Sequence, residues 1–78
     1  MPTVLWIGPY RFFFFASDRG EPLHVHVERE NMVAKFWLAP VRLQYSKGFG
    51  RPELGKLKLM VDENRQRFEE AWYAYFGN

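Results

Sequence analysis

The chain has 78 residues, of which 11 are Lys or Arg and 9 are Asp or Glu, and it contains no cysteine. This length is near the lower limit for a core that folds unaided, so we expect one domain over residues 1–78, with strands and a hairpin in 1–46 and helix in 50–77. Because the chain has no cysteine, it can form neither disulfides nor thiolate metal sites, and it has no thiolate nucleophile. No membrane-spanning run or signal peptide is seen, which favours a cytoplasmic protein.

The first half of the chain has the composition of short strands separated by turn residues. Apolar and β-branched runs bounded by Gly, Pro or Asn are typical of strands. A loop is expected at 17–22, and a turn at Glu30-Asn31. The strands are predicted at 3–7, 10–16, 24–29, 32–38 and 41–45.

The hairpin around Glu30-Asn31 has a register that the sequence can predict. With a two-residue loop, the valines of one strand face apolar residues of the next, and the polar residues segregate to the other face. This register pairs Val27 with Ala34, Val25 with Phe36, His26 with Lys35 and His24 with Trp37.

The hydrophobic period changes to that of a helix over residues 51–76. Gly50 is predicted as the N-cap, with Glu53 as half of a capping box. Gly77 is placed to end the helix. A break near 62–64 would give two helices, because one helix of this span exceeds the length of a short strand.

These elements predict an α+β fold: a small, mainly antiparallel sheet of three to five strands, packed on one face by a long or broken C-terminal helix. The helix should cover the face that carries Val25, Val27 and Phe36. The opposite face then stays uncovered and is expected to bind a protein partner or a second copy. Its binding candidates are Phe13, Phe15, Trp37 and Glu28.

Two histidines one residue apart are the most informative motif. Because side chains at i and i+2 of a strand project from the same face, His24 and His26 should lie side by side. One hypothesis is a metal-independent ribonuclease, in which His24 and His26 act as proton donor and acceptor while Lys35 and Arg11 stabilise the transition state. Lys35, opposite His26, would lower the pKa of that imidazole.

A second reading is a metal or nucleic-acid-binding module. A metal site needs a third ligand, for which Glu28, Asp18 and Glu21 are candidates, so that we assign no metal ligand or cofactor from the sequence. Nucleic acid could meet the aromatic run 10–15 or a mildly basic stretch formed by Arg42, Lys47, Arg51, Lys56 and Lys58, which makes RNA a candidate partner.

Several separated segments resemble the DUF4160 family of small bacterial proteins. They are 2–5, 8–14, 21–27, 34–38 and the C-terminal 70–77, so that the resemblance extends over essentially the whole chain. The family commonly has Pro-Pro-His where this chain has Pro22-Leu23-His24. The resemblance implies a small stand-alone protein, often encoded beside another small protein as in toxin–antitoxin pairs, and it implies no established activity.

The leading hypothesis is therefore an interaction module that acts through an uncovered, histidine-bearing sheet face, as one component of a toxin–antitoxin-type pair. The ribonuclease and the metal or nucleic-acid-binding module remain the alternatives.

Overall fold

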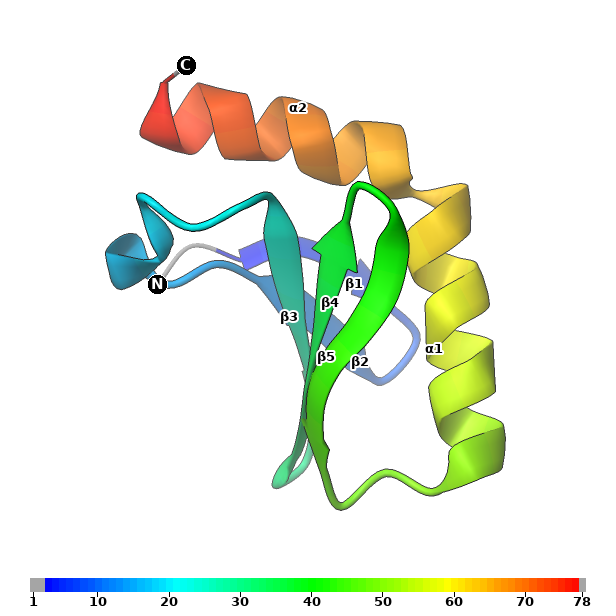
Figure 1. Ribbon diagram of the computed structural model, residues 1–78. Helices are drawn as coiled ribbons and strands as arrows, with labels where there is room; N and C mark the ends of the chain where they lie inside the picture. The colour runs from blue at the N-terminus through cyan, green and yellow to red at the C-terminus, as the bar shows by residue number, and fades with distance from the viewer. Residues whose placement is uncertain (1–2, 78) are drawn as a thin grey trace.

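The computed structural model describes residues 3–77 and consists of a five-stranded sheet followed by two helices (Figure 1). Each strand pairs antiparallel with the next one along the chain, in the order β1-β2-β3-β4-β5. The strands are β1 (Thr3–Ile7), β2 (Tyr10–Phe13), β3 (His24–Arg29), β4 (Met32–Leu38) and β5 (Val41–Lys47). The predicted α+β fold is confirmed.

The strand boundaries follow the sequence closely, with two differences. The predicted strand over 10–16 ends at Phe13, and a single 3₁₀ turn, η1 (Ala16–Asp18), follows it. Strand β5 continues two residues further than predicted, to Lys47. The difference in β2 matters, because it directs the chain between β2 and β3 over the sheet.

The β3–β4 hairpin has the predicted register. Val27 pairs with Ala34, and His26 pairs with Lys35. Glu30 in the turn adopts a positive φ of 56°, the left-handed conformation that tight hairpin turns require. The alternation of apolar and polar residues therefore fixed this register as expected.

Both edge strands are irregular. The pairing of β1 with β2 shifts between Thr3 and Leu5, and that of β4 with β5 shifts between Lys35 and Phe36. Such bulges disfavour the addition of a further strand at a sheet edge. A binding surface is thus better sought on a face of the sheet than along its edges.

The C-terminal helix is broken, which decides between the one long helix and the two helices that the sequence left open. Helix α1 (Arg51–Glu63) and helix α2 (Arg65–Phe76) meet at Asn64, where the chain changes direction (Figure 1). Gly50 is the N-cap of α1, as predicted. The predicted capping-box role of Glu53 is wrong, because its carboxylate binds Tyr10 and Arg29 of the sheet instead.

The helices cover one face of the sheet and build a single core with it. The face that they cover carries Val25, Val27 and Phe36, as predicted. Aromatic residues fill much of the interior; for example, the rings of Phe12 and Phe68 stack with centroids 5.1 Å apart. The buried core consists of Tyr10, Phe12, Phe14, Val25, Val27, Ala34, Phe36, Leu38, Phe49, Leu57, Val61, Phe68 and Trp72.

Among residues 3–77, neither helix combines the length and the apolar character needed to cross a bilayer.

Candidate functional site

The two histidines of β3 project from the sheet face opposite the one that carries Val25, Val27 and Phe36. Alternation along the strand places His24 and His26 on this face and Val25 on the other. Strand β2 contributes Phe13, whose ring stacks on His26 with a centroid distance of 5.4 Å. Arg11 and Phe13 thus lie on the histidine face, while Tyr10, Phe12 and Phe14 face the core.

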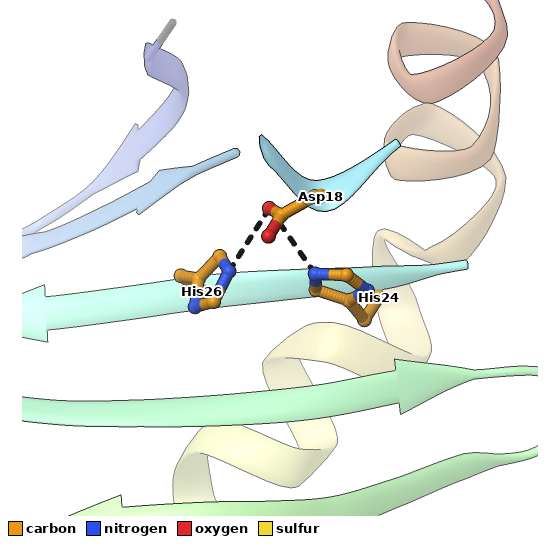
Figure 2. A group of neighbouring side chains, drawn as sticks. All are labelled: Asp18, His24 and His26. Atoms are coloured by element: carbon orange, nitrogen blue, oxygen red, sulfur yellow. Dashed lines mark hydrogen bonds and ion pairs between the residues drawn. The ribbon is translucent and has the colours of Figure 1, made fainter. Parts of the chain in front are cut away.

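The prediction that this face is uncovered is wrong at its His24 end. The segment between β2 and β3 folds over it and places η1 above the histidines (Figure 2). His24 has no exposed surface, and Phe13 is only 3% exposed. The rings of Trp37 and Trp72 approach His24 to centroid distances of 5.6 and 5.0 Å, so that α2 also closes this end.

The loop above the histidines positions one carboxylate between them. Asp18 Oδ2 lies 3.1 Å from His24 Nε2 and 3.0 Å from His26 Nε2 (Figure 2). The same oxygen accepts a hydrogen bond of 2.8 Å from the backbone N–H of Phe15, which fixes the carboxylate within the turn. Asp18, His24 and His26 thus form a buried cluster at the junction of η1 and β3.

The imidazole of His24 has a defined orientation. Its Nδ1 lies 2.8 Å from the carbonyl oxygen of Pro22. A carbonyl oxygen can only accept a hydrogen bond, so this nitrogen carries a proton. In the neutral ring, Nε2 then has a lone pair directed toward the cluster. Within the described part of the chain, this buried nitrogen has no hydrogen-bond partner, because its approach to Asp18 lacks hydrogen-bond geometry.

The electrostatics of the cluster favour an ionised Asp18 beside a neutral His26. Burial alone would raise the pKa of Asp18, but the N–H of Phe15 and the two imidazoles together hold that pKa below its usual value. Burial lowers the pKa of His26, against the attraction of Asp18. The predicted influence of Lys35 on the pKa of His26 has the expected sign, and burial is the larger cause.

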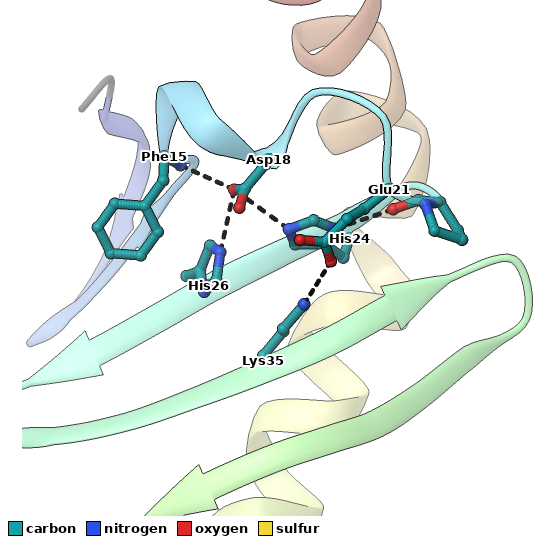
Figure 3. Close-up of polar contacts among 7 residues, drawn as sticks. Phe15, Asp18, Glu21, His24, His26 and Lys35 are labelled. Carbon is teal, nitrogen blue, oxygen red and sulfur yellow. Dashed lines mark hydrogen bonds and ion pairs between the residues drawn. The ribbon is translucent and has the colours of Figure 1, made fainter.

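The two predicted catalytic cations each have an anionic partner. Lys35, opposite His26 in the register, binds Glu21 with Nζ 2.7 Å from Oε1 (Figure 3). This hydrogen bond holds the pKa of Glu21 below its usual value. Arg11 Nη1 lies 3.2 Å from Glu28 Oε2, and its Nε donates to Thr3. Arg11 is therefore engaged away from the histidine cluster.

An open pocket adjoins the cluster on the side of His26, and we call it the β3–β5 pocket. Its volume is 250 Å³. Phe15 and Tyr45, which line it, are 39% and 52% exposed. Trp37 and Glu28, two of the four predicted binding residues, lie outside it. The lining residues are Phe13, Phe15, His26, Val33, Ala34, Lys35, Gln44 and Tyr45.

Part of this site could be predicted from the sequence. The spacing of His24 and His26 predicts that they lie side by side, whereas Asp18 was one of three acids offered as a third ligand. Glu21 and Glu28, the other two, bind Lys35 and Arg11. The carbonyl of Pro22 and the contribution of Tyr45 to the pocket had no signal in the sequence, because both depend on how the loop and β5 fold onto the sheet.

Comparison with known proteins identifies one family. The model described as "Domain of unknown function (DUF4160)" matches residues 10–73, which include the histidine pair, η1 and most of the two helices. The comparisons with curated proteins and with solved structures found no match.

Proposed function

We propose that this chain, which belongs to the DUF4160 family, is an interaction module that holds an apolar side chain of a protein partner in its β3–β5 pocket. The observation that carries this proposal is the pocket itself, an apolar hollow bordered by the exposed rings of Phe15 and Tyr45. Anchoring of one apolar side chain in such a pocket is a common centre of protein interfaces.

The size and lining of the β3–β5 pocket favour a side chain over a small molecule. Its 250 Å³ falls below the range of about 300–1,000 Å³ that is usual for small-molecule sites. Phe13, Phe15 and Val33 supply apolar wall, whereas His26 and Lys35 supply the polar groups. An apolar centre with a few polar neighbours is the anatomy of an interface core.

The geometry gives less support to the ribonuclease alternative. A pair of histidines acting as general acid and base must both reach the substrate. His24 is fully buried, and Arg11 is held by Glu28. Only His26 and Lys35 of the four proposed catalytic residues border the pocket.

The partner that we propose is the other component of a toxin–antitoxin-type pair, which is what the family resemblance suggests. The edge bulges of β1 and β5 support recognition through the sheet face rather than through strand addition.

A site-specific crosslinking experiment tests this proposal. A photoreactive phenylalanine analogue replaces Tyr45, which borders the pocket, or Tyr73 of α2, which serves as the control. The two positions are similarly exposed, at 52% and 46%. The full chain is expressed in its native host and irradiated.

We expect a discrete crosslinked product from position 45 and none from position 73. A product of twice the chain mass identifies a second copy as the partner, and any other discrete mass identifies a different protein. Equal labelling at both positions, or none at either, would contradict the proposal. A product with RNA at position 45 would favour the nucleic-acid alternative instead.

A further inference from the structure

The Asp18–His24–His26 cluster brings three potential metal ligands together in one place. We propose that it binds one divalent transition-metal ion, best matched by Zn²⁺, through a carboxylate oxygen of Asp18 and the Nε2 atoms of both histidines. This site is separate from the partner-binding role proposed above, and it does not depend on it.

The three donor atoms are gathered in one place, and a small shift of the two imidazoles would let them share an ion. They all lie within 4.8 Å of one another, and Asp18 Oδ2 is 3.0–3.1 Å from each imidazole nitrogen. Two atoms that bind the same zinc ion tetrahedrally at about 2.0–2.2 Å are separated by about 3.3–3.6 Å. The two observed distances are a few tenths of an ångström shorter, so binding of an ion would move the carboxylate oxygen and the imidazole nitrogens slightly apart.

The unpartnered nitrogen of His24 is the observation that points to an ion. Nitrogen Nε2 is buried, faces the cluster and makes no hydrogen bond among the described residues. A buried polar atom without a partner destabilises a fold by about 1–3 kcal/mol. A metal ion satisfies such a lone pair, and Asp18 supplies negative charge to balance the ion.

The surroundings of the cluster match those of known metal ligands. A histidine that binds metal through one nitrogen usually donates its other N–H to a carbonyl or carboxylate, which fixes the tautomer. His24 makes this contact with Pro22, and the ring of Trp72 packs against it. The carboxylate of Asp18 is likewise held by the N–H of Phe15.

A hydrogen bond to Asp18 explains the position of His26, but it does not explain the position of His24. His26 Nε2 lies in hydrogen-bond geometry with Asp18 at 3.0 Å, so a proton there would be shared with the carboxylate. A proton on His24 Nε2 would still lack an acceptor in line with it. An ion between the three atoms has no such directional requirement and satisfies both rings.

Binding would join the loop to the sheet. Asp18 belongs to η1, whereas both histidines belong to β3, so the ion would fasten the turn over the sheet face. Because His26 also lines the β3–β5 pocket, the site adjoins the proposed docking surface. Three protein ligands leave at least one coordination position, which water takes in many zinc sites.

The test uses the full chain, purified without an affinity tag. The chain has two histidines and no cysteine, so that imidazole ligation can arise only in this cluster. Isothermal calorimetry measures the binding of Zn²⁺ to the wild type, to Asp18→Asn and to Glu28→Gln. Glu28 is the matched control. Its carboxylate lies on the same face of β3 as the two histidines, but it pairs with Arg11.

We expect one Zn²⁺ per chain, with Kd raised at least about tenfold by Asp18→Asn and within about twofold of wild type in Glu28→Gln. Ca²⁺, which prefers all-oxygen sites, should not saturate the protein. Equal affinities for the wild type and Asp18→Asn would overturn the proposal, as would the absence of saturable Zn²⁺ binding.

Circular dichroism reports whether each variant folds. If Asp18→Asn does not fold, the calorimetry uses His26→Gln instead, because the side chain of His26 is more exposed than that of Asp18. If neither folds, Co²⁺ added to the wild type decides: strong visible bands that saturate at one equivalent support the site, and the weak spectrum of aqueous Co²⁺ contradicts it.

Discussion

Two polar clusters lie on opposite sides of the sheet. In one of them the side-chain donors all have hydrogen-bond partners, whereas in the other a buried nitrogen has none within residues 3–77. On the side of the helices, Glu53 accepts hydrogen bonds from Arg29 at 2.8 and 2.9 Å and a further one from the hydroxyl of Tyr10. On the opposite face, Asp18 lies between two imidazoles, and one buried nitrogen there has no hydrogen-bond partner among the described residues.

The difference separates a structural cluster from a candidate site. Both clusters join a segment of the chain to the sheet: Glu53 fastens α1, and Asp18 fastens the loop before β3. Every donor aimed at Glu53 finds an acceptor, so the protein alone satisfies that cluster. In the Asp18 cluster, one buried nitrogen has no hydrogen-bond partner among the described residues, which is a property expected of a ligand site.

The largest expected effect is stabilisation by zinc. With free Zn²⁺ at 100 times Kd, the free energy of unfolding should rise by about 2.7 kcal/mol in the wild type. The same increment is expected in Tyr10→Phe, because the two clusters share no residue. Urea unfolding with and without Zn²⁺ measures it. An equal increment in Asp18→Asn would show that zinc acts elsewhere.

A smaller effect is expected from Tyr10→Phe in the absence of metal. Tyr10 is 3% exposed and donates to Glu53, so loss of its hydroxyl should lower the free energy of unfolding by about 1 kcal/mol. Tyr73→Phe is the matched control, since Tyr73 is 46% exposed and should change stability by less than about 0.5 kcal/mol. Equal effects of the two substitutions would remove the evidence that the Glu53 cluster stabilises the fold.

The cluster around Glu53 also predicts how the stability of the fold depends on pH. Arg29, and then Tyr10, hold the pKa of Glu53 below its usual value. Such a carboxylate adds stability above its unfolded pKa, and this is lost as the pH falls through the lower folded pKa. Below about pH 5, the wild type should therefore lose stability more steeply than Glu53→Gln. Parallel pH curves from urea unfolding would contradict this assignment.

The smallest effect on stability is expected at the β3–β5 pocket. Tyr45→Ala removes a ring that is 52% exposed, so the free energy of unfolding should change by less than about 0.5 kcal/mol. Zn²⁺ affinity should also be unchanged, since Tyr45 contributes no ligand. Co-purification with the crosslinked partner should nevertheless be lost. Retention of the partner by Tyr45→Ala would place the interface elsewhere.

The sequence predicted the regular elements well, because each was encoded by residues close together in the chain. Alternation set the register of His26 opposite Lys35, and the helical period gave the extent of the helical region, although it left one helix or two open. These features depend on local spacing, which a sequence displays directly.

The candidate site was predicted only in part, because its parts meet through a loop. The spacing of His24 and His26 was sufficient to put them on one face. The position of Asp18 depends on β2 ending at Phe13 and on the turn that follows, which carries no periodic signal. For the same reason, the expectation of an uncovered face was wrong: nothing in residues 17–22 indicates that they fold over the sheet.

The most direct test of the account is the nitrogen NMR spectrum of the two imidazoles, recorded on tag-free protein before and after one equivalent of Zn²⁺. We expect the Nε2 resonances of both His24 and His26 to move to values for metal-bound nitrogen, while Nδ1 of His24 keeps its proton and its bond to Pro22. Imidazole resonances that stay unchanged by zinc, or a proton found on Nε2 of His24 in both samples, would contradict it.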